Sequence, residues 1–155
     1  MVRKLPAQET EKLGEGYDFE ESVGYWMVLA SQAFQNSLSN ELAPHGITFR
    51  QCQVLGWIAL EGELSQVQLA SRMMIEPATL VGVLDRMERD GLICRIASVA
   101  DRRCKMICAS RQAKHVWEKV ACCARKVRAR AVHGLTPNQV KVLKKTLRIV
   151  LGNLS

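Results

Sequence analysis

The stretch from residue 65 to 91 most constrains the fold, because it carries the start and stop signals of two short helices. Ser65 and Gln68 have the spacing of a capping box, which predicts a helix N-terminus. After a three-residue turn, Pro77 suits the first position of a second helix, and Gly91 suits the residue just past its end. The stretch therefore predicts a helix-turn-helix. The apolar residues expected to be buried from the first helix are Val67, Leu69, Ala70 and Met73.

The second of these helices has two chemically different faces. Apolar residues at three- and four-residue steps are expected to be buried: Leu80, Val83, Leu84 and Met87. At 3.6 residues per turn, small residues and arginines share the outer face: Thr79, Gly82, Arg86 and Arg89. Small residues allow close approach to a surface, and arginines can hold phosphates at its flank. This face is therefore predicted to bind a polyanion, with an ordinary surface helix of a bundle as the alternative.

After Gly91 the apolar period changes from 3.6 to 2, which predicts a β-hairpin. The residues expected to face inward are Leu92, Cys94 and Ile96 in the first strand and Cys104, Met106 and Cys108 in the second. A register in which opposed residue numbers add up to 200 pairs Cys94 with Met106 and Arg95 with Lys105, leaving residues 97–103 as the turn region. Two like charges opposite each other would repel in water, so this pairing favours a polyanionic partner. The predicted hairpin is thus a basic wing.

Several motifs together resemble the MarR/SlyA family of bacterial transcription regulators. They are Ile47-Thr48, Gln51, Val54-Leu55, Leu69-Ala70, Leu80-Val81, the run Leu84-Asp85-Arg86-Met87-Glu88-Arg89-Asp90-Gly91-Leu92-Ile93, and Asp101-Arg102-Arg103. The resemblance covers about residues 22–154. It implies a mainly α fold with a small β-hairpin wing, a winged helix-turn-helix, and a helical dimerisation region made by the N- and C-terminal helices. It also implies that the second helix enters a major groove of double-stranded DNA.

The resemblance gives each predicted DNA contact a role. Arg102 is expected to reach an adjacent minor groove, with Asp101 bracing it. The residues expected against base edges are Pro77, Ala78, Thr79 and Gly82, and those expected to hold phosphate or flanking backbone are Ser65, Arg86, Arg89, Arg103 and Lys105. Two features depart from the family pattern. Gly82 stands where a larger polar or basic side chain is common, and Ala109-Ser110-Arg111-Gln112-Ala113 replaces the usual start of the next helix.

The remaining chain reads as a short arm and one helical domain. Residues 1–21 carry a net charge of −3 and few apolar residues, so they are expected to be flexible or arm-like. Since the whole chain has a net charge of +7, residues 22–155, which are predicted to form a single domain, carry +10. Its predicted winged helix-turn-helix covers about 48–109, and its dimerisation helices cover about 22–43, 110–133 and 136–154. The last helix is apolar on more than one side, which predicts a homodimer on a pseudo-palindromic operator.

Aromatic residues suggest where a ligand would bind. In the family a small-molecule pocket lies between the dimerisation helices and the DNA-binding lobe. The lining residues expected here are Tyr25, Trp26, His45, Phe49 and Trp57, for a small aromatic or phenolic ligand that relieves repression. The alternative is that they are core aromatics and a loop histidine.

The six cysteines leave a redox alternative open. Free cysteines are usually small buried hydrophobes, but Cys122 and Cys123 stand among Lys119, Arg125 and Lys126, which could lower a thiol pKa. A redox-responsive regulator is therefore one alternative function. A winged-helix dimer that acts through protein–protein contacts is another, and Gly82 keeps it open.

Other classes of function are not predicted. The sequence shows no nucleophile–base pairing at a spacing known for enzymes, and no Cys-x-x-Cys or histidine cluster for a metal, so neither an enzyme nor a cofactor is expected. It has no apolar run of ~18 residues and no signal-peptide core. We therefore expect a cytoplasmic protein without a membrane partner.

Overall fold

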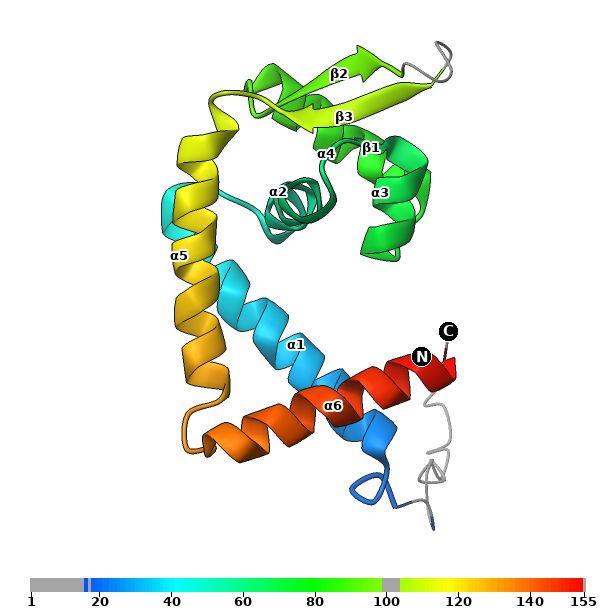
Figure 1. The fold of residues 1–155 in the computed structure, drawn as a ribbon, viewed down its shortest axis with the longest axis vertical. Helices are drawn as coiled ribbons and strands as arrows, with labels where there is room; N and C mark the ends of the chain where they lie inside the picture. Colours follow the sequence, from blue (N-terminus) through cyan, green and yellow to red (C-terminus); the bar gives the residue numbers. More distant parts are fainter. Residues whose placement is uncertain (1–15, 17, 99–103, 155) are drawn as a thin grey trace, which may run out of the picture. The chain divides into compact units, whose positions relative to one another are not determined.

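The computed structural model describes residues 16, 18–98 and 104–154. The elements in chain order are α1 (Val23–Leu42), the 3-10 helix η1 (Ala43–His45), α2 (Phe49–Glu61), β1 (Leu64–Ser65), α3 (Gln66–Met73), α4 (Pro77–Arg89), β2 (Ile93–Ala97), β3 (Lys105–Ala109), α5 (Ala113–Ala131) and α6 (Pro137–Leu154), labelled in Figure 1. The chain divides into two units, Met1–Ala33 and Phe34–Ser155, and each is described by itself. The described helices and strands agree with a winged helix-turn-helix.

The N-terminal unit holds the first half of α1. Its start is organised by local polar contacts, in which Tyr25 N donates to Ser22 Oγ at 3.4 Å. Trp26 Nε1 donates to the carbonyl oxygen of Glu20 at 2.7 Å, and the rings of Tyr25 and Trp26 meet edge to face with centroids 5.4 Å apart. None of its described residues is buried, so its apolar side chains still face outward.

The hydrophobic core belongs to the second unit. It joins the end of α1 to α2, α3, α4, the sheet and α5. The largest fully buried side chains are Leu42, Val54, Leu69, Leu80, Leu84, Met87, Ile107, Val120, Cys123 and Val127. The described residues include no buried polar or charged side chain, as expected when burial must be compensated by hydrogen bonds.

The predicted helix signals are confirmed by the hydrogen bonds. Capping boxes close at Ser65 with Gln68, and at Thr48 with Gln51, so each helix start satisfies two backbone donors. Pro77 occupies the first turn of α4. Gly91 has φ +70° after α4, a left-handed conformation that favours glycine.

One expectation for α3 is wrong. Val67 was predicted to be buried, but its side chain is 68% exposed. The buried side of α3 is instead formed by Leu69, Ala70 and Met73. Val67 precedes Leu69 by two residues, which places it about 200° around the helix from that residue.

The sheet also corrects the predicted wing. It has three antiparallel strands in the order β1-β3-β2, and the short strand β1 was not predicted. In the observed register Cys94 pairs with Cys108, and Arg95 pairs with Ile107, so opposed numbers add up to 202 and not 200. The inward faces are reversed as well, because Ile93 and Ile107 are buried. Cys94, expected inside, is exposed, and Cys104 and Cys108 are half-buried.

Helix α5 runs from the sheet past the end of α1 (Figure 1). It begins at Ala113, three residues later than predicted, with Gln112 at the N-cap. The Ser110 hydroxyl accepts from Ala113 N and donates to the carbonyl oxygen of Gly91, which ties the start of α5 to the end of α4. Further along, Arg130 Nη2 donates to Ser37 Oγ at 2.7 Å and to Glu41 Oε1 at 3.2 Å. These contacts fix α5 against the last turns of α1.

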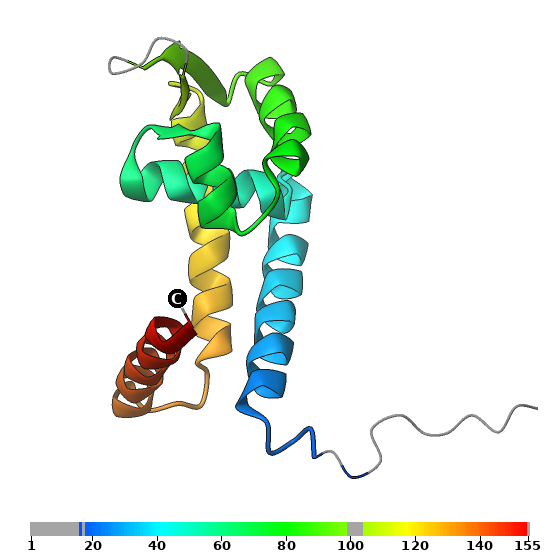
Figure 2. The same ribbon diagram turned by 90° about the vertical axis from the view of Figure 1, so that its right-hand side faces the viewer.

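Helix α6 follows at the end of α5 that lies away from the sheet (Figures 1 and 2). A capping box closes its start, since Gln139 N donates to Thr136 Oγ1 and Thr136 N donates to Gln139 Oε1. None of its residues is buried in the single chain, although the helix is rich in leucine, isoleucine and valine. Across the described residues, the helices are all too short or too polar to serve as a transmembrane span.

Candidate nucleic-acid interface

The outer face of α4 is exposed to solvent. Pro77, Ala78, Thr79, Gly82, Arg86 and Arg89 are all exposed, while Leu80, Val83, Leu84 and Met87 are buried on the opposite side. The predicted division of this helix into two faces is confirmed. An added Cβ at Gly82 would meet nothing within 4 Å, so the fold does not require glycine there. The small size of Gly82 therefore affects only how closely an external partner can approach the helix.

The two arginines of this face are available for an external anion. Arg86 has no hydrogen-bond or ion-pair partner among the described residues. Arg89 Nε contacts Asp90 Oδ1 at 3.3 Å, but its side chain is 72% exposed. An exposed ion pair of this kind contributes little energy, so Arg89 can exchange its partner at small cost.

Arg95 of β2 behaves differently from the sequence expectation. Its Nη2 lies 2.6 Å from Asp85 Oδ1, and its Nη1 contacts Glu88 Oε2, so it bridges two carboxylates of α4. The hydrogen bond that Arg95 donates to Asp85 is the main reason why the pKa of the Arg95 guanidinium is raised above its usual range, and the charge of Glu88 adds to it. The predicted repulsion between Arg95 and Lys105 is absent, since Arg95 lies opposite Ile107. Sequence reasoning missed this bridge, which fixes the wing to α4 and neutralises acid beside its outer face.

Two of the predicted flanking contacts lie on neighbouring strands, Ser65 at the end of β1 and Lys105 at the start of β3. The hydroxyl of Ser65 accepts from Gln68 N at 3.2 Å, and Gln66 Nε2 reaches the carbonyl oxygen of Pro77 at 3.4 Å. Lys105 is exposed opposite Ala97. A hollow of about 320 Å³ is lined by Ser65, Gln66, Val67, Arg95, Cys104, Lys105 and Ile107. Asp101, Arg102 and Arg103 lie outside the described residues.

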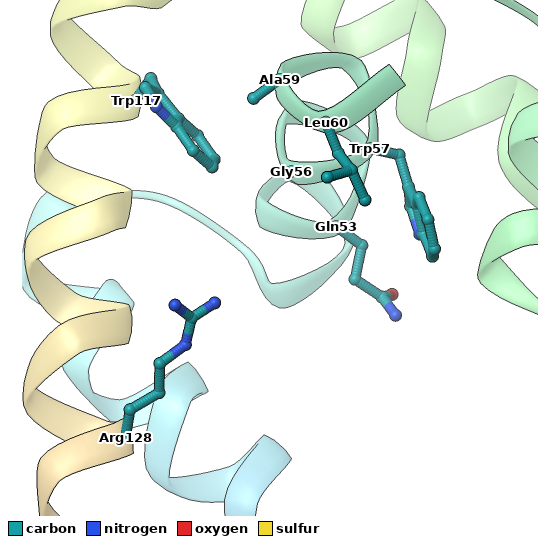
Figure 3. A pocket seen from close by; sticks show the side chains of 7 residues that line it. All are labelled: Gln53, Gly56, Trp57, Ala59, Leu60, Trp117 and Arg128. Atoms are coloured by element: carbon teal, nitrogen blue, oxygen red, sulfur yellow. The ribbon is translucent and has the colours of Figure 1, made fainter. Parts of the chain in front are cut away.

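A second candidate site is an open groove of about 430 Å³ between α2 and α5. Figure 3 shows Trp117 and Arg128 extending from α5 toward α2, which contributes Trp57 and Gln53. Trp57 was a predicted lining residue, whereas Trp117 and Arg128 were missed. These two residues are eleven positions apart, close to three helical turns, so they share one face of α5. That spacing was the signal that could have identified them.

The other predicted pocket residues do not gather around this groove. His45 lines a separate hollow together with Cys122, Cys123 and other residues of α5. Phe49 packs half-buried against the core. Tyr25 and Trp26 belong to the N-terminal unit. The predicted five-residue pocket is therefore not present as one site within Phe34–Ser155.

The adjacent cysteines of α5 differ in their surroundings. Cys122 is exposed, whereas Cys123 is buried with its Sγ 3.4 Å from the carbonyl oxygen of Glu41. Burial also raises the pKa of the Cys52 thiol to about 11, which keeps it protonated. Among the residues that the structure describes, no group of three or more His, Cys, Asp or Glu side chains is arranged to hold a metal ion.

Comparisons with known proteins agree on one fold. The model of the MarR family matches residues 47–105. A MarR family transcriptional regulator from Silicibacter pomeroyi is similar at 22% identity over 94% of this chain and 97% of that chain, with a TM-score of 0.79. CouR from Rhodococcus jostii RHA1 bound to p-coumaroyl-CoA gives 22% identity over 86% and 94%, with a TM-score of 0.76. BpsR from Bordetella bronchiseptica, whose DNA binding is regulated by 6-hydroxynicotinic acid, gives 24% identity over 86% and 96%, with a TM-score of 0.76.

Proposed function

Because the chain belongs to the MarR family of transcription regulators, we propose that it binds double-stranded DNA in a sequence-specific manner as a homodimer. It acts on a pseudo-palindromic operator, and its role is that of a repressor. The observation that carries this proposal is the outer face of α4, which is exposed and small at Thr79 and Gly82 and ends in two available arginines. Such a helix can enter a major groove with its N-terminal residues toward base edges.

The dimer is proposed from helix α6. Its apolar side chains are exposed in the single chain: Val142, Leu143, Leu147, Ile149, Leu151 and Leu154. Leu143, Leu147, Leu151 and Leu154 lie within about 80° of one another around the helix, and a contiguous apolar face of this kind marks a protein–protein interface. Two-fold symmetry would then present two α4 helices about one DNA turn apart, roughly 34 Å.

Arg102→Ala tests the proposed wing contact. We expect operator affinity to fall by about 1–3 kcal/mol, roughly 5- to 150-fold, because a cation is lost where a narrow minor groove concentrates negative potential. The logarithm of the affinity of the unaltered protein should also fall linearly with the logarithm of salt concentration, as counterions return to the DNA. The operator is first selected from a random DNA library, and affinity is then measured by gel-shift titration.

Arg125→Ala on α5 is the matched control, since it removes the same charge from an exposed position outside the proposed contacts. Unchanged affinity for Arg102→Ala rules out the minor-groove role. Failure of the unaltered protein to select any DNA would favour a protein-interaction module instead.

We further propose that the groove between α2 and α5 binds a small aromatic acid that relieves repression. Trp57 and Trp117 offer apolar faces, and Arg128 has no ion-pair partner among the described residues. The ligands named for CouR and BpsR are aromatic acids or their thioesters, which fits this composition. Such a ligand can act only if it binds the DNA-free spacing of the dimer better than the DNA-bound one.

6-Hydroxynicotinic acid is a direct probe of this groove. We expect it to quench tryptophan fluorescence and to lower operator affinity. In Arg128→Met both effects should need about tenfold more ligand, because one charge-assisted contact is lost. Lys126→Met is the control from the neighbouring face of α5. Quenching that is equal in both variants would place the ligand elsewhere.

A further inference from the structure

Two cysteines face each other across the wing. Cys94 of β2 and Cys108 of β3 are direct partners in the register, and their Sγ atoms lie 3.0 Å apart. Each thiol also lies near the carbonyl oxygen of the other residue, at 3.8 Å from Cys94 Sγ and 3.4 Å from Cys108 Sγ. The sequence register placed Cys94 opposite Met106, so this pair could not be recognised before the fold was known.

The spacing of the backbone at this pair permits a disulfide. Ser110 N donates to the carbonyl oxygen of Leu92, and Ser98 N donates to that of Cys104. These two bonds show that the pairs 92/110 and 98/104 are hydrogen-bonded. Hydrogen-bonded pairs recur at every second residue of an antiparallel ladder, so Cys94 and Cys108 also form a hydrogen-bonded pair, with Cα atoms about 5.5 Å apart. Disulfides span Cα distances of about 4.4–6.8 Å, so the bond can form after the two sulfurs approach by roughly 1 Å.

The two thiols have different surroundings, which assigns them different roles. Cys94 is exposed, so an oxidant can reach its sulfur. Cys108 is half-buried, and burial, followed by its contact with Cys94, raises the pKa of its thiol to about 12. Cys108 therefore retains its proton. Because its sulfur belongs to the exposed residue of the pair, Cys94 is the attacking residue and Cys108 the resolving one.

We propose that Cys94 and Cys108 form a reversible thiol-oxidation site that responds to hydroperoxides. The Cys94 thiolate attacks the terminal oxygen of the hydroperoxide, whose O–O bond breaks and releases an alcohol, or water from hydrogen peroxide. Cys94 is then a sulfenic acid. The Cys108 sulfur attacks the Cys94 sulfur, the S–O bond breaks, and water leaves with the thiol proton. Two thiols are oxidised to one disulfide while one peroxide is reduced.

The disulfide would affect the DNA-binding surface through Arg95, the residue that follows Cys94. Arg95 follows Cys94 in β2 and contacts Asp85 and Glu88 of α4 from the opposite face of the strand. Drawing the two sulfurs together on one face changes the local twist of β2 and β3, and therefore displaces Arg95 from the two carboxylates that it neutralises beside the outer face of α4. This regulatory consequence rests on the proposed DNA-binding function, whereas the thiol chemistry does not.

The chemistry is tested on the full chain with hydrogen peroxide added in near-stoichiometric amount. We expect two free thiols per chain to be lost, peptide mass mapping to identify a Cys94–Cys108 disulfide within one chain, and dithiothreitol to restore both thiols. In Cys108→Ser, dimedone should label Cys94, whereas Cys122→Ser, which removes another exposed thiol, should form the disulfide like the unaltered protein. Two intact thiols at Cys94 and Cys108, or a first disulfide elsewhere, would overturn the proposal; the map of the unaltered protein decides this even if a variant does not fold.

The regulatory arm compares operator affinity before and after oxidation. We expect oxidation to lower the affinity about tenfold in the unaltered protein and in Cys122→Ser, but not in Cys94→Ser. A disulfide that forms without any change in affinity overturns the regulatory role. If the reduced protein selects no DNA, the proposed function fails while the mapped disulfide still supports the thiol site.

Discussion

Arg95→Met is expected to weaken operator binding by about 2 kcal/mol, roughly 30-fold, although Arg95 is not proposed to touch DNA. In the folded chain this guanidinium, whose side chain is 19% exposed, pairs with Asp85 and Glu88. Without it, two carboxylates of α4 stand uncompensated beside the phosphates that Arg86 and Arg89 are proposed to hold. The partners are 58% and 40% exposed, so solvent screens the pair and the free energy of unfolding should fall by only about 1 kcal/mol.

A rescue variant separates this explanation from direct phosphate contact. Adding Asp85→Asn and Glu88→Gln to Arg95→Met removes the uncompensated charges while keeping side-chain size. We expect operator affinity to return to within about threefold of the unaltered protein, because the repulsion is gone. Affinity and unfolding are measured by gel-shift titration and by urea denaturation at one protein concentration, since dimer stability depends on concentration. If the triple variant binds as weakly as Arg95→Met alone, uncompensated charge on α4 is not the cause of the lost affinity.

The helices of this protein could be predicted from local chemistry. Ser65 with Gln68, Pro77 and Gly91 are signals that act within a few residues, and the structure places each at the expected end of a helix. The division of α4 into a buried and an exposed face follows from the helical period in the same way. Such signals do not depend on distant parts of the chain, so the sequence sufficed to find them.

The wing could not be predicted to the same depth. Its strands are apolar at both parities, since Ile93 and Ile107 alternate with Cys94 and Cys108, so the pattern alone did not define the inner face. The observed face is selected by tertiary contacts. Leu64 of β1 pairs with buried Ile107, and Arg95 finds two carboxylates on α4. Neither partner is visible in the hairpin sequence.

The groove between α2 and α5 could not be predicted from the sequence either. Trp57 of α2 was recognised as an aromatic candidate, but Arg128 of α5 reaches the groove only because two helices far apart in sequence lie on either side of it. His45, another candidate, lines a different hollow. Composition identified useful side chains, and the packing of α2 with α5 decided which of them share a site.

The combined substitution of Leu143 and Leu147 by glutamate is expected to convert the dimer into a monomer. Both side chains are exposed in the single chain, and four residues separate them, so they lie on one face of α6. Each glutamate would have to be buried without a counter-ion if the two chains associated, which is strongly unfavourable. Operator affinity should then fall by about 100-fold or more, because a monomer loses the gain from binding two half-sites together. Analytical ultracentrifugation and gel-shift titration measure the two effects.

Lys145→Glu is the control with the same change in net charge. It turns one positive charge negative, as the double variant adds two negative charges, and residue 145 lies about 200° around α6 from Leu143. We expect Lys145→Glu to remain dimeric and to retain most of its affinity, so that electrostatic repulsion from DNA alone cannot account for the loss. A double variant that sediments as a dimer would show that α6 does not form the interface. A monomeric variant that keeps full affinity would show instead that one copy suffices for the operator, and the argument from two-fold symmetry would fail.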